Sequence, residues 1–264
     1  VMIGSGTEGG SELFKVKYYE REAFLAQSGQ LYKQALVPSL GKVWSISPSF
    51  RAEKSHTPKH VTEFWQIEME AAFYGKEEMM ECEERLVRLV AERVSESCGG
   101  MLKTAIPEFP ARFERLSYEK ACEEVGLEFG SDLKAEHEHR LCLARQAPFF
   151  LTEYPTSEVS FYYKQVEGRP ELAHRVDLLG YGEGGWELSS GGVREEKPEK
   201  LRERLVAKGM SPESFSWYLE MFRYGFPPHA GFGIGLERLA QTLVGAKNIK
   251  EVIPFPRTPE TIVP

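Results

Sequence analysis

The chain has 264 residues, of which 41% are hydrophobic and 28% are charged, and its formal net charge is −7. This composition argues against a disordered chain, and the acidic balance argues against a protein whose whole surface binds nucleic acid. No apolar run approaches the roughly 20 residues that cross a bilayer, and no leader-like segment opens the chain, so we expect a cytoplasmic protein without membrane contact. Its four cysteines form no C-x-x-C pair, which argues against a zinc site or a disulfide framework.

The first third of the chain alternates strand-like runs with turn residues. It opens in a glycine-rich stretch, residues 1–10, that resembles an entry into the middle of a domain. Aromatic and β-branched residues predict strands over residues 13–19, 23–26, 43–47 and 64–73. A short helix is expected over residues 30–37, because Pro38 disfavours the helical conformation before it.

Helices dominate the middle of the chain. Residues 76–97 carry apolar side chains at every third or fourth position, the period of an amphipathic helix, and the following glycines end it. Ser117 as an N-cap predicts a helix over residues 117–125, and another is expected over residues 132–147.

The last third of the chain returns to strands before it ends in helices. Strands are predicted over residues 149–152, 161–166, 173–179 and 186–190. Ser211, Pro212 and Glu213 predict the start of a helix that runs through Arg223, and a last helix is expected over residues 236–244. Strands and helices in blocks predict an α/β fold of the α+β type, a mainly antiparallel sheet flanked by helices.

Two short blocks carry the functional signal. Residues 50–53 (Phe-Arg-Ala-Glu), a polar loop and residues 63–70 with alternating carboxylates fit a hairpin that holds cations and carboxylates over a phosphate-bearing ligand. This hairpin resembles motif 2 of the class II aminoacyl-tRNA synthetases. Residues 231–239, Gly-Phe-Gly-Ile-Gly-Leu-Glu-Arg-Leu, resemble motif 3 of the same family. The resemblance covers nearly the whole chain, so residues 1–264 are expected to form the catalytic domain of an ATP-dependent aminoacyl-tRNA ligase.

The resemblance implies an ATP site. It places Arg51 at the α-phosphate and Arg238 at the γ end, where planar, always-charged guanidinium groups suit phosphate. His60 is expected at the outer phosphates, Phe64 stacked on adenine and Glu53 near the adenine amino group. Without the motif, Phe64 would be assigned to the core and a lone arginine to a solvated surface.

The resemblance also implies Mg²⁺ as a cofactor. It places Glu187, Ser190 and Asp177 as oxygen ligands, and magnesium prefers such oxygens together with substrate phosphates. For Asp177 the alternative is a structural role in capping a turn. His137 and His139 are two apart on a predicted helix and therefore point to different faces, so no metal site is expected there.

The amino-acid substrate is narrowed to asparagine or aspartate by residues 26–34 and by Glu8. The resemblance implies that Glu8, Gln30 and Ser28 hold the α-amino group and that Arg194 reaches the side-chain end. Lys33 and Glu68 are expected to discriminate, because a carboxylate substrate wants cations whereas an amide wants one donor and one acceptor. Lys33 is aspartyl-like and Glu68 asparaginyl-like. We favour asparagine on the longest contiguous match, with aspartate as the alternative.

The sequence also departs from the family. Motif 1, which builds the homodimer interface, and the anticodon-binding barrel are expected before Val1 and are absent from this sequence. Pro58 and Lys59 precede His60 where an arginine is usual, which puts loop contacts with tRNA and ATP in doubt. Two other functions stay open: a paralogue that passes aspartyl-adenylate to ammonia to make asparagine, and an inactive synthetase-like binding subunit. The expected partners are the amino acid, tRNA and a second copy of the chain.

Overall fold

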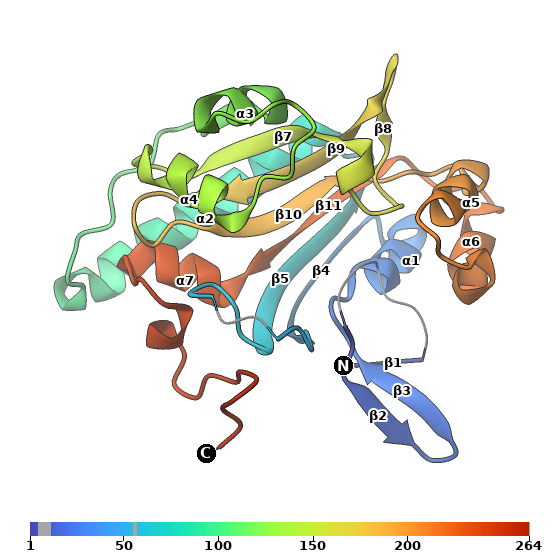
Figure 1. The fold of residues 1–264 in the computed structure, drawn as a ribbon, viewed down its shortest axis with the longest axis horizontal. Helices are drawn as coiled ribbons and strands as arrows, with labels where there is room; N and C mark the ends of the chain where they lie inside the picture. The colour runs from blue at the N-terminus through green and yellow to red at the C-terminus, as the bar shows by residue number, and fades with distance from the viewer. Residues whose placement is uncertain (5–11, 55–56, 264) are drawn as a thin grey trace.

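The computed structural model describes residues 1–4, 12–54 and 57–263, and an eight-stranded sheet forms its centre (Figure 1). The strand order is β4-β5-β11-β10-β9-β7-β6, and β8 pairs with β9 beside this path. The strands are β4 (Lys42–Phe50), β5 (Glu63–Ala72), β6 (Glu114–Ser117), β7 (Phe149–Pro155), β8 (Gln165–Val166), β9 (Arg169–Leu179), β10 (Glu187–Val193) and β11 (His229–Gly235). Among these strands only the pairing of β6 with β7 is parallel, so the predicted fold class is confirmed.

A smaller three-stranded sheet precedes the main one. It has the order β1 (Met2–Ile3), β3 (Arg21–Leu25), β2 (Lys15–Tyr18), and Figure 1 shows it below α1 (Gln30–Leu40). The carbonyl of Ala26 accepts from the backbone N of Phe50 at 2.9 Å, and this contact ties the small sheet to the end of β4.

Helices cover both faces of the main sheet (Figure 1). The helices after α1 are α2 (Lys76–Cys98), α3 (Tyr118–Val125), α4 (Ala135–Leu143), α5 (Pro198–Ala207), α6 (Ser216–Phe222) and α7 (Leu236–Val244), with 3-10 turns at Gly99–Met101, Thr156–Glu158, Pro212–Phe215 and Ile249–Val252. On one face, Met79 and Val87 of α2 and Leu239 of α7 pack with Phe232 of β11. Within the described residues, none of these helices is long and apolar enough to cross a membrane.

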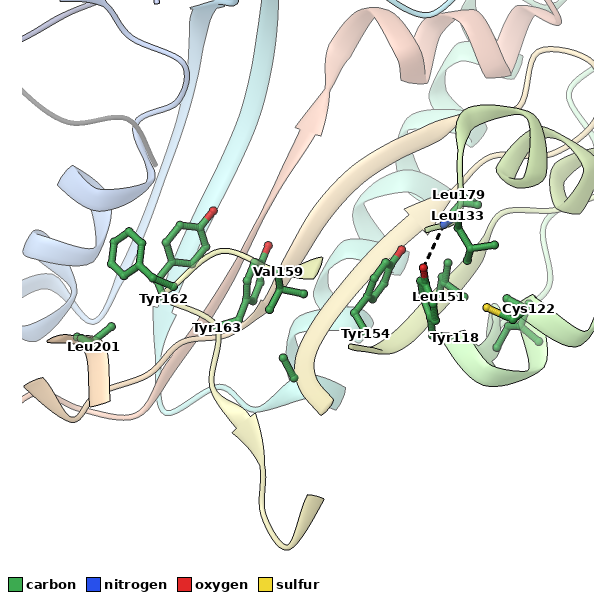
Figure 2. Packing of buried hydrophobic residues seen from close by; sticks show 14 of the residues in the cluster. Tyr118, Cys122, Leu133, Leu151, Tyr154, Val159, Tyr162, Tyr163, Leu179 and Leu201 are labelled. Carbon is green, nitrogen blue, oxygen red and sulfur yellow. Dashed lines mark hydrogen bonds between the residues drawn. The ribbon is translucent and has the colours of Figure 1, made fainter. Parts of the chain in front are cut away.

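The second core lies on the opposite face, under α3 to α6, and is rich in tyrosine (Figure 2). The rings of Tyr118 and Tyr154 lie 4.7 Å apart. The Tyr118 hydroxyl donates to the Ser131 carbonyl at 2.7 Å and accepts from the Leu133 backbone N at 3.1 Å, the contact dashed in Figure 2. Because burial raises the pKa of Tyr118 to about 12, its hydroxyl stays a donor and both polar groups are satisfied.

The proline in α1 was wrongly expected to end that helix. Pro38 lies inside α1, which continues to Leu40. The proline removes only one hydrogen bond in the last turn, while Val37, fully buried, anchors that turn and its carbonyl accepts from Gly41 N at 2.9 Å. Packing therefore outweighs the local preference.

Three other predicted elements differ in extent. Residues 161–166 are a strand only at β8, because Phe161 and Tyr162 turn their rings into the core. The helix expected over 132–147 is shorter, as α4 shows, and the helix expected over 211–223 begins as a 3-10 turn before α6. The remaining predicted helices, above all α2, match the expected ranges closely, and all four cysteines are free, as predicted.

Candidate active site

A pocket of about 300 Å³ opens over the middle of the main sheet, on the face opposite α2. Alternate residues of β5 point into it, from Phe64 to Glu70, because successive side chains of a strand face opposite sides. The neighbouring strands β11, β10 and β9 supply the rest of the floor, and α1 and α7 contribute at its edges.

The structure brings together most of the residues that the sequence analysis assigned to the site. The predicted residues that line the pocket are Ser28, Gln30, Lys33, Arg51, Glu53, His60, Phe64, Glu68, Glu187, Ser190, Arg194 and Arg238. Glu8 lies outside the described residues. Asp177 is described and does not line the pocket.

A bulge in β10 explains how Glu187 and Ser190, three apart in sequence, both reach the pocket. The pairing of β10 with β9 shifts register between Glu187 and Ser189. Leu188 therefore joins the core under α2, and Ser189 hydrogen-bonds Glu83 of that helix. A regular strand would have turned Glu187 and Ser190 to opposite faces.

Arg238, in the first turn of α7, is tied to Glu187. Its Nη1 donates to the Glu187 carbonyl at 2.9 Å and to Oε1 at 3.2 Å, and its Nε donates to the Lys59 carbonyl at 3.3 Å. Burial opposes ionisation of Glu187, but Arg238, then Lys59 and Arg175, hold its pKa at about 2. The pair is thus fully charged at neutral pH and fixes the guanidinium at the pocket edge.

Arg51 and Phe64 form a second unit, at the hairpin of β4 and β5. The Arg51 guanidinium carbon lies 5.4 Å from the centre of the Phe64 ring. Arg51 Nε is buried and has no hydrogen-bond partner among the described residues. A buried donor without a partner is costly, and this one borders the pocket, so an anionic ligand would satisfy it.

The loop between β4 and β5 contains His60, which lines the pocket, and Lys59, which pairs with a distant helix. Burial, then Arg238 and Lys59, lower the pKa of His60 to about 4, so this imidazole is neutral at pH 7. Lys59 Nζ is buried and donates to Glu138 of α4 at 2.8 Å. The lysine at the unusual motif position is therefore engaged by a segment about 80 residues further along the chain.

At the other end of the pocket, Lys33 and Glu68 form an ion pair. Lys33 Nζ lies 2.9 Å from Glu68 Oε2 and 3.0 Å from the Ser45 hydroxyl. Both Glu68 oxygens also accept from the Gly29 backbone N, at 3.1 and 3.2 Å. The charges of Lys33 and Glu68 therefore cancel.

Arg194 is paired in the same way with Glu70. Its Nη2 lies 2.7 Å from Glu70 Oε1 and 3.0 Å from the Gly231 carbonyl, whereas its Nη1 is buried without a hydrogen-bond partner among the described residues. A Cβ at Gly231 would lie 2.2 Å from the Glu70 carboxyl carbon, so motif 3 needs a glycine there. Burial alone would lower the pKa of Arg194, but Glu70 raises it, and the guanidinium stays charged.

The predicted metal ligands divide in two. Glu187 and Ser190 face the pocket and fit one magnesium ion that arrives with a nucleotide. Asp177 does not fit, because Tyr154 donates to Oδ2 at 2.5 Å and Arg175 donates to Oδ1 and Oδ2 at 3.0 and 2.7 Å. Only 1% of Asp177 is exposed. Its predicted role as a ligand is therefore corrected to an anchor for Arg175.

The sequence analysis missed Glu70, Arg175 and the Lys59–Glu138 pair as site residues. Glu70 could have been found, because it is two residues after Glu68 and shares its face of β5. Arg175 also shares the face of Asp177 on β9. The Lys59–Glu138 pair joins distant segments and left no local signal.

Comparison with known proteins identifies the family of this chain. The family model described as tRNA synthetases class II (D, K and N) matches residues 1–259. The asparagine–tRNA ligase of Thermococcus gammatolerans is 39% identical over 282 residues, with 100% of this chain and 64% of the relative covered. The aspartate–tRNA(Asp/Asn) ligase of Methanothermobacter thermautotrophicus is 42% identical over 274 residues, with 100% and 62% covered.

A solved structure gives the same result for the fold. Asparaginyl-tRNA synthetase from Pyrococcus horikoshii, complexed with asparaginyl-adenylate, superposes with a TM-score of 0.94 at 38% identity. The match covers 100% of this chain and 63% of that one. The chain therefore spans somewhat less than two thirds of the length of these relatives.

Proposed function

The chain belongs to the class II tRNA synthetases of the D, K and N group, and from this premise we propose that it activates asparagine with ATP and transfers the asparaginyl group to tRNA. The observation that carries the choice of asparagine is the charge balance at the amino-acid end of the pocket. Lys33 is neutralised by Glu68 and Arg194 by Glu70. Among the described residues at this end of the pocket, these pairs leave no net positive charge for a side-chain carboxylate of the substrate, and an uncharged amide fits.

The same residues offer the two hydrogen bonds that an amide needs. Arg194 Nη1, buried and unpartnered among the described residues, can donate to the amide oxygen. Glu68 can accept from the amide NH₂, because a carboxylate has about four acceptor positions. Gln30 Nε2, also unpartnered within the described part of the chain, lies at the pocket wall where we place the α-amino and α-carboxyl groups.

The ATP end supports adenylate formation by positioning and electrostatics. The substrate carboxylate attacks the α-phosphorus in line, the bond to the bridging oxygen breaks, and pyrophosphate leaves. Arg51 is suited to the charge at the α-phosphate and Arg238 to the leaving group, with Phe64 beneath the adenine and Glu53 near its amino group. His60, neutral in the free chain, can offer the outer phosphates a hydrogen bond but no charge. Glu187 and Ser190 would hold a Mg²⁺ ion bound together with ATP, and the ion would supply positive charge to the phosphates.

The second step and the partners follow from the same proposal. The 3′-terminal ribose hydroxyl of tRNA attacks the adenylate carbonyl and releases AMP, which needs no side-chain nucleophile. A cytoplasmic location accords with this use of tRNA. A homodimer is supported by β4, an edge strand whose outward face carries the exposed side chains of Trp44 and Ile46.

Aspartate is the second candidate substrate, because Lys33 and Arg194 both border the pocket and could bind its side-chain carboxylate in place of Glu68 and Glu70. ATP–pyrophosphate exchange with each amino acid separates the two. Exchange that depends on asparagine alone supports the proposal, and exchange that depends on aspartate alone assigns the alternative. Exchange with neither amino acid would overturn the proposed enzymatic function and would favour an inactive binding subunit.

The acceptor is tested in the same preparation. Asparagine attached to the 3′ end of tRNA supports the proposed ligase. Free asparagine formed from aspartate, ATP and ammonium, without charged tRNA, would assign the paralogue that uses ammonia.

A further inference from the structure

Arg175 of β9 is a third arginine in the pocket, beside Arg51 and Arg238. Its guanidinium carbon lies 4.4 Å from the centre of the Tyr154 ring, and its Nε and Nη2 hold Asp177. Nη2 also lies 3.9 Å from Glu187 Oε2. The guanidinium thus lies between Asp177 and Glu187, the two carboxylates that the sequence assigned to magnesium.

The strand register puts Arg175 there. Asp177 pairs across the sheet with Ser190, and Arg175 pairs with Gly192, so all four face the pocket side of β9 and β10. A Cβ at Gly192 would lie 2.8 Å from the Tyr163 ring and 2.2 Å from the His174 carbonyl, so the position opposite Arg175 stays without a side chain. The arginine can therefore lie along the floor toward Asp177.

One edge of the Arg175 guanidinium is available to a ligand. The Arg175 side chain is 21% exposed, whereas that of Asp177 is 1% exposed. Among the described residues no hydrogen bond is made by Arg175 Nη1. Tyr154 already donates a hydrogen bond to Asp177. A guanidinium that served only to neutralise this carboxylate would not have to border the pocket, as that of Arg175 does.

We propose that Arg175 is a fixed cation that binds the polyphosphate of ATP. It takes the place of a divalent ion that Asp177 would otherwise bind. This inference rests on the proposed function, since it assumes that the pocket binds ATP. Its consequence is that the chain retains much of its ATP affinity when magnesium is removed. The charge that Arg175 supplies is covalently attached and cannot be chelated.

The first test is calorimetric titration of the 264-residue chain with the non-hydrolysable analogue AMP-PNP, with Mg²⁺ or with EDTA. For the wild type we expect the dissociation constant to rise less than about tenfold in EDTA. For Arg175→Gln we expect a further loss of about tenfold or more in EDTA and a much smaller loss with Mg²⁺. Arg169→Gln, on the same strand but exposed and paired with Glu171, is the matched control and should behave as wild type.

A second pair of variants guards against misfolding. Arg175→Gln leaves Asp177 buried without its cation, so Arg175→Gln/Asp177→Asn is prepared as well, and melting temperatures are compared. Arg175→Lys keeps the charge and should keep most of the affinity in EDTA. The double variant should still lose affinity in EDTA if the cation acts on ATP.

The second test counts bound ions. Electron paramagnetic resonance of Mn²⁺ with AMP-PNP should show one more ion per chain for Arg175→Gln than for the wild type, because Asp177 then keeps the Tyr154 donor but has lost the cation that paired with it. Equal losses of affinity with and without Mg²⁺, together with equal ion counts, would overturn the inference and leave the proposed function standing. A wild type that does not bind AMP-PNP even with Mg²⁺ would overturn the proposed function and this inference with it.

Discussion

Glu68 neutralises Lys33 and, in the proposed function, also presents a hydrogen-bond acceptor to the substrate. We predict that Glu68→Gln lowers kcat/KM for asparagine about 10- to 100-fold, as expected for a lost hydrogen bond to a charged group. The variant also leaves Lys33 unpaired, so the ratio of aspartate to asparagine activity should rise. Amino-acid-dependent pyrophosphate exchange measures both.

The control for this variant is Glu22→Gln, which removes a carboxylate paired with Lys15 on the surface. It should leave both activities unchanged. An unaltered aspartate-to-asparagine ratio in Glu68→Gln would contradict the role given to the Lys33–Glu68 pair.

Glu83 lies on the other side of the sheet and gives a prediction about pH. It is fully buried on α2, hydrogen-bonds Ser189, and burial raises its pKa to about 8. The folded chain therefore keeps a proton that the unfolded chain releases near pH 4.5. The stability that this group contributes is full below pH 4.5 and is lost as the pH rises to about 8.

Glutamine cannot ionise, so Glu83→Gln should escape this loss. We predict that the difference in free energy of unfolding, Glu83→Gln minus wild type, increases by about 1 kcal/mol per pH unit between pH 4.5 and about pH 8. Urea titrations at several pH values measure it. Glu81→Gln, exposed on the same helix, should follow the wild-type profile, and parallel profiles for Glu83→Gln would refute the assignment.

At the residue scale, the sequence could predict the site residues that lie in a motif. It could not predict which side chains form ion pairs with each other. Arg51, Phe64 and Arg238 were placed by their motifs, and all three line the pocket. The partner of Lys59 was beyond reach, because Glu138 is 79 residues away and no local pattern links the two.

Helices and strands also could be predicted where local sequence determines them, and not where contacts with distant segments do. Helix α2 could be predicted almost to the residue, because its apolar period runs for 23 residues. Strand β6, with four residues and a parallel partner, and α5, in which five of ten residues are charged, were not predicted. The bulge in β10 was missed as well, because a bulge is a property of two paired strands and not of either sequence alone.

Strand β11 depends on one glycine for its fit to β5. Gly231 lies opposite Glu70, and a Cβ there would be 2.3 Å from the Met69 carbonyl and 2.2 Å from the Glu70 carboxyl carbon. We predict that Gly231→Ala costs about 1–3 kcal/mol of folding free energy by overpacking. It should also reduce asparagine-dependent exchange, because Glu70 must move away from Arg194.

Gly99→Ala is the matched control for this strand, since nothing lies within 4 Å of the added carbon and its φ of −54° suits alanine. Thermal unfolding of both variants measures the difference. Equal melting temperatures would mean that β5 and β11 tolerate a wider gap than their register implies.

At the scale of the whole molecule, the uncovered side of β4 and β5 gives the clearest prediction. Trp44 is 72% exposed, Ile46 50% and Trp65 44%, and the register places them on one face at the sheet edge. If this face forms the proposed homodimer, Trp44→Lys should shift the chain toward monomer, because it puts a charge into an apolar interface.

Sedimentation equilibrium over a range of concentrations measures the association. Tyr224→Lys, on an equally exposed aromatic residue next to α6, should leave it unchanged. A wild type that is monomeric throughout, or a Trp44→Lys variant that associates as strongly, would count against this surface as the interface.

The Arg194–Glu70 pair has a consequence for the order in which the molecule is built. Its two halves are 124 residues apart, and both must be in place before Arg194 Nη1 faces the pocket. In the proposed function, the chain therefore acquires its selectivity for the amino acid only when β10 has paired with β11 and β11 with β5.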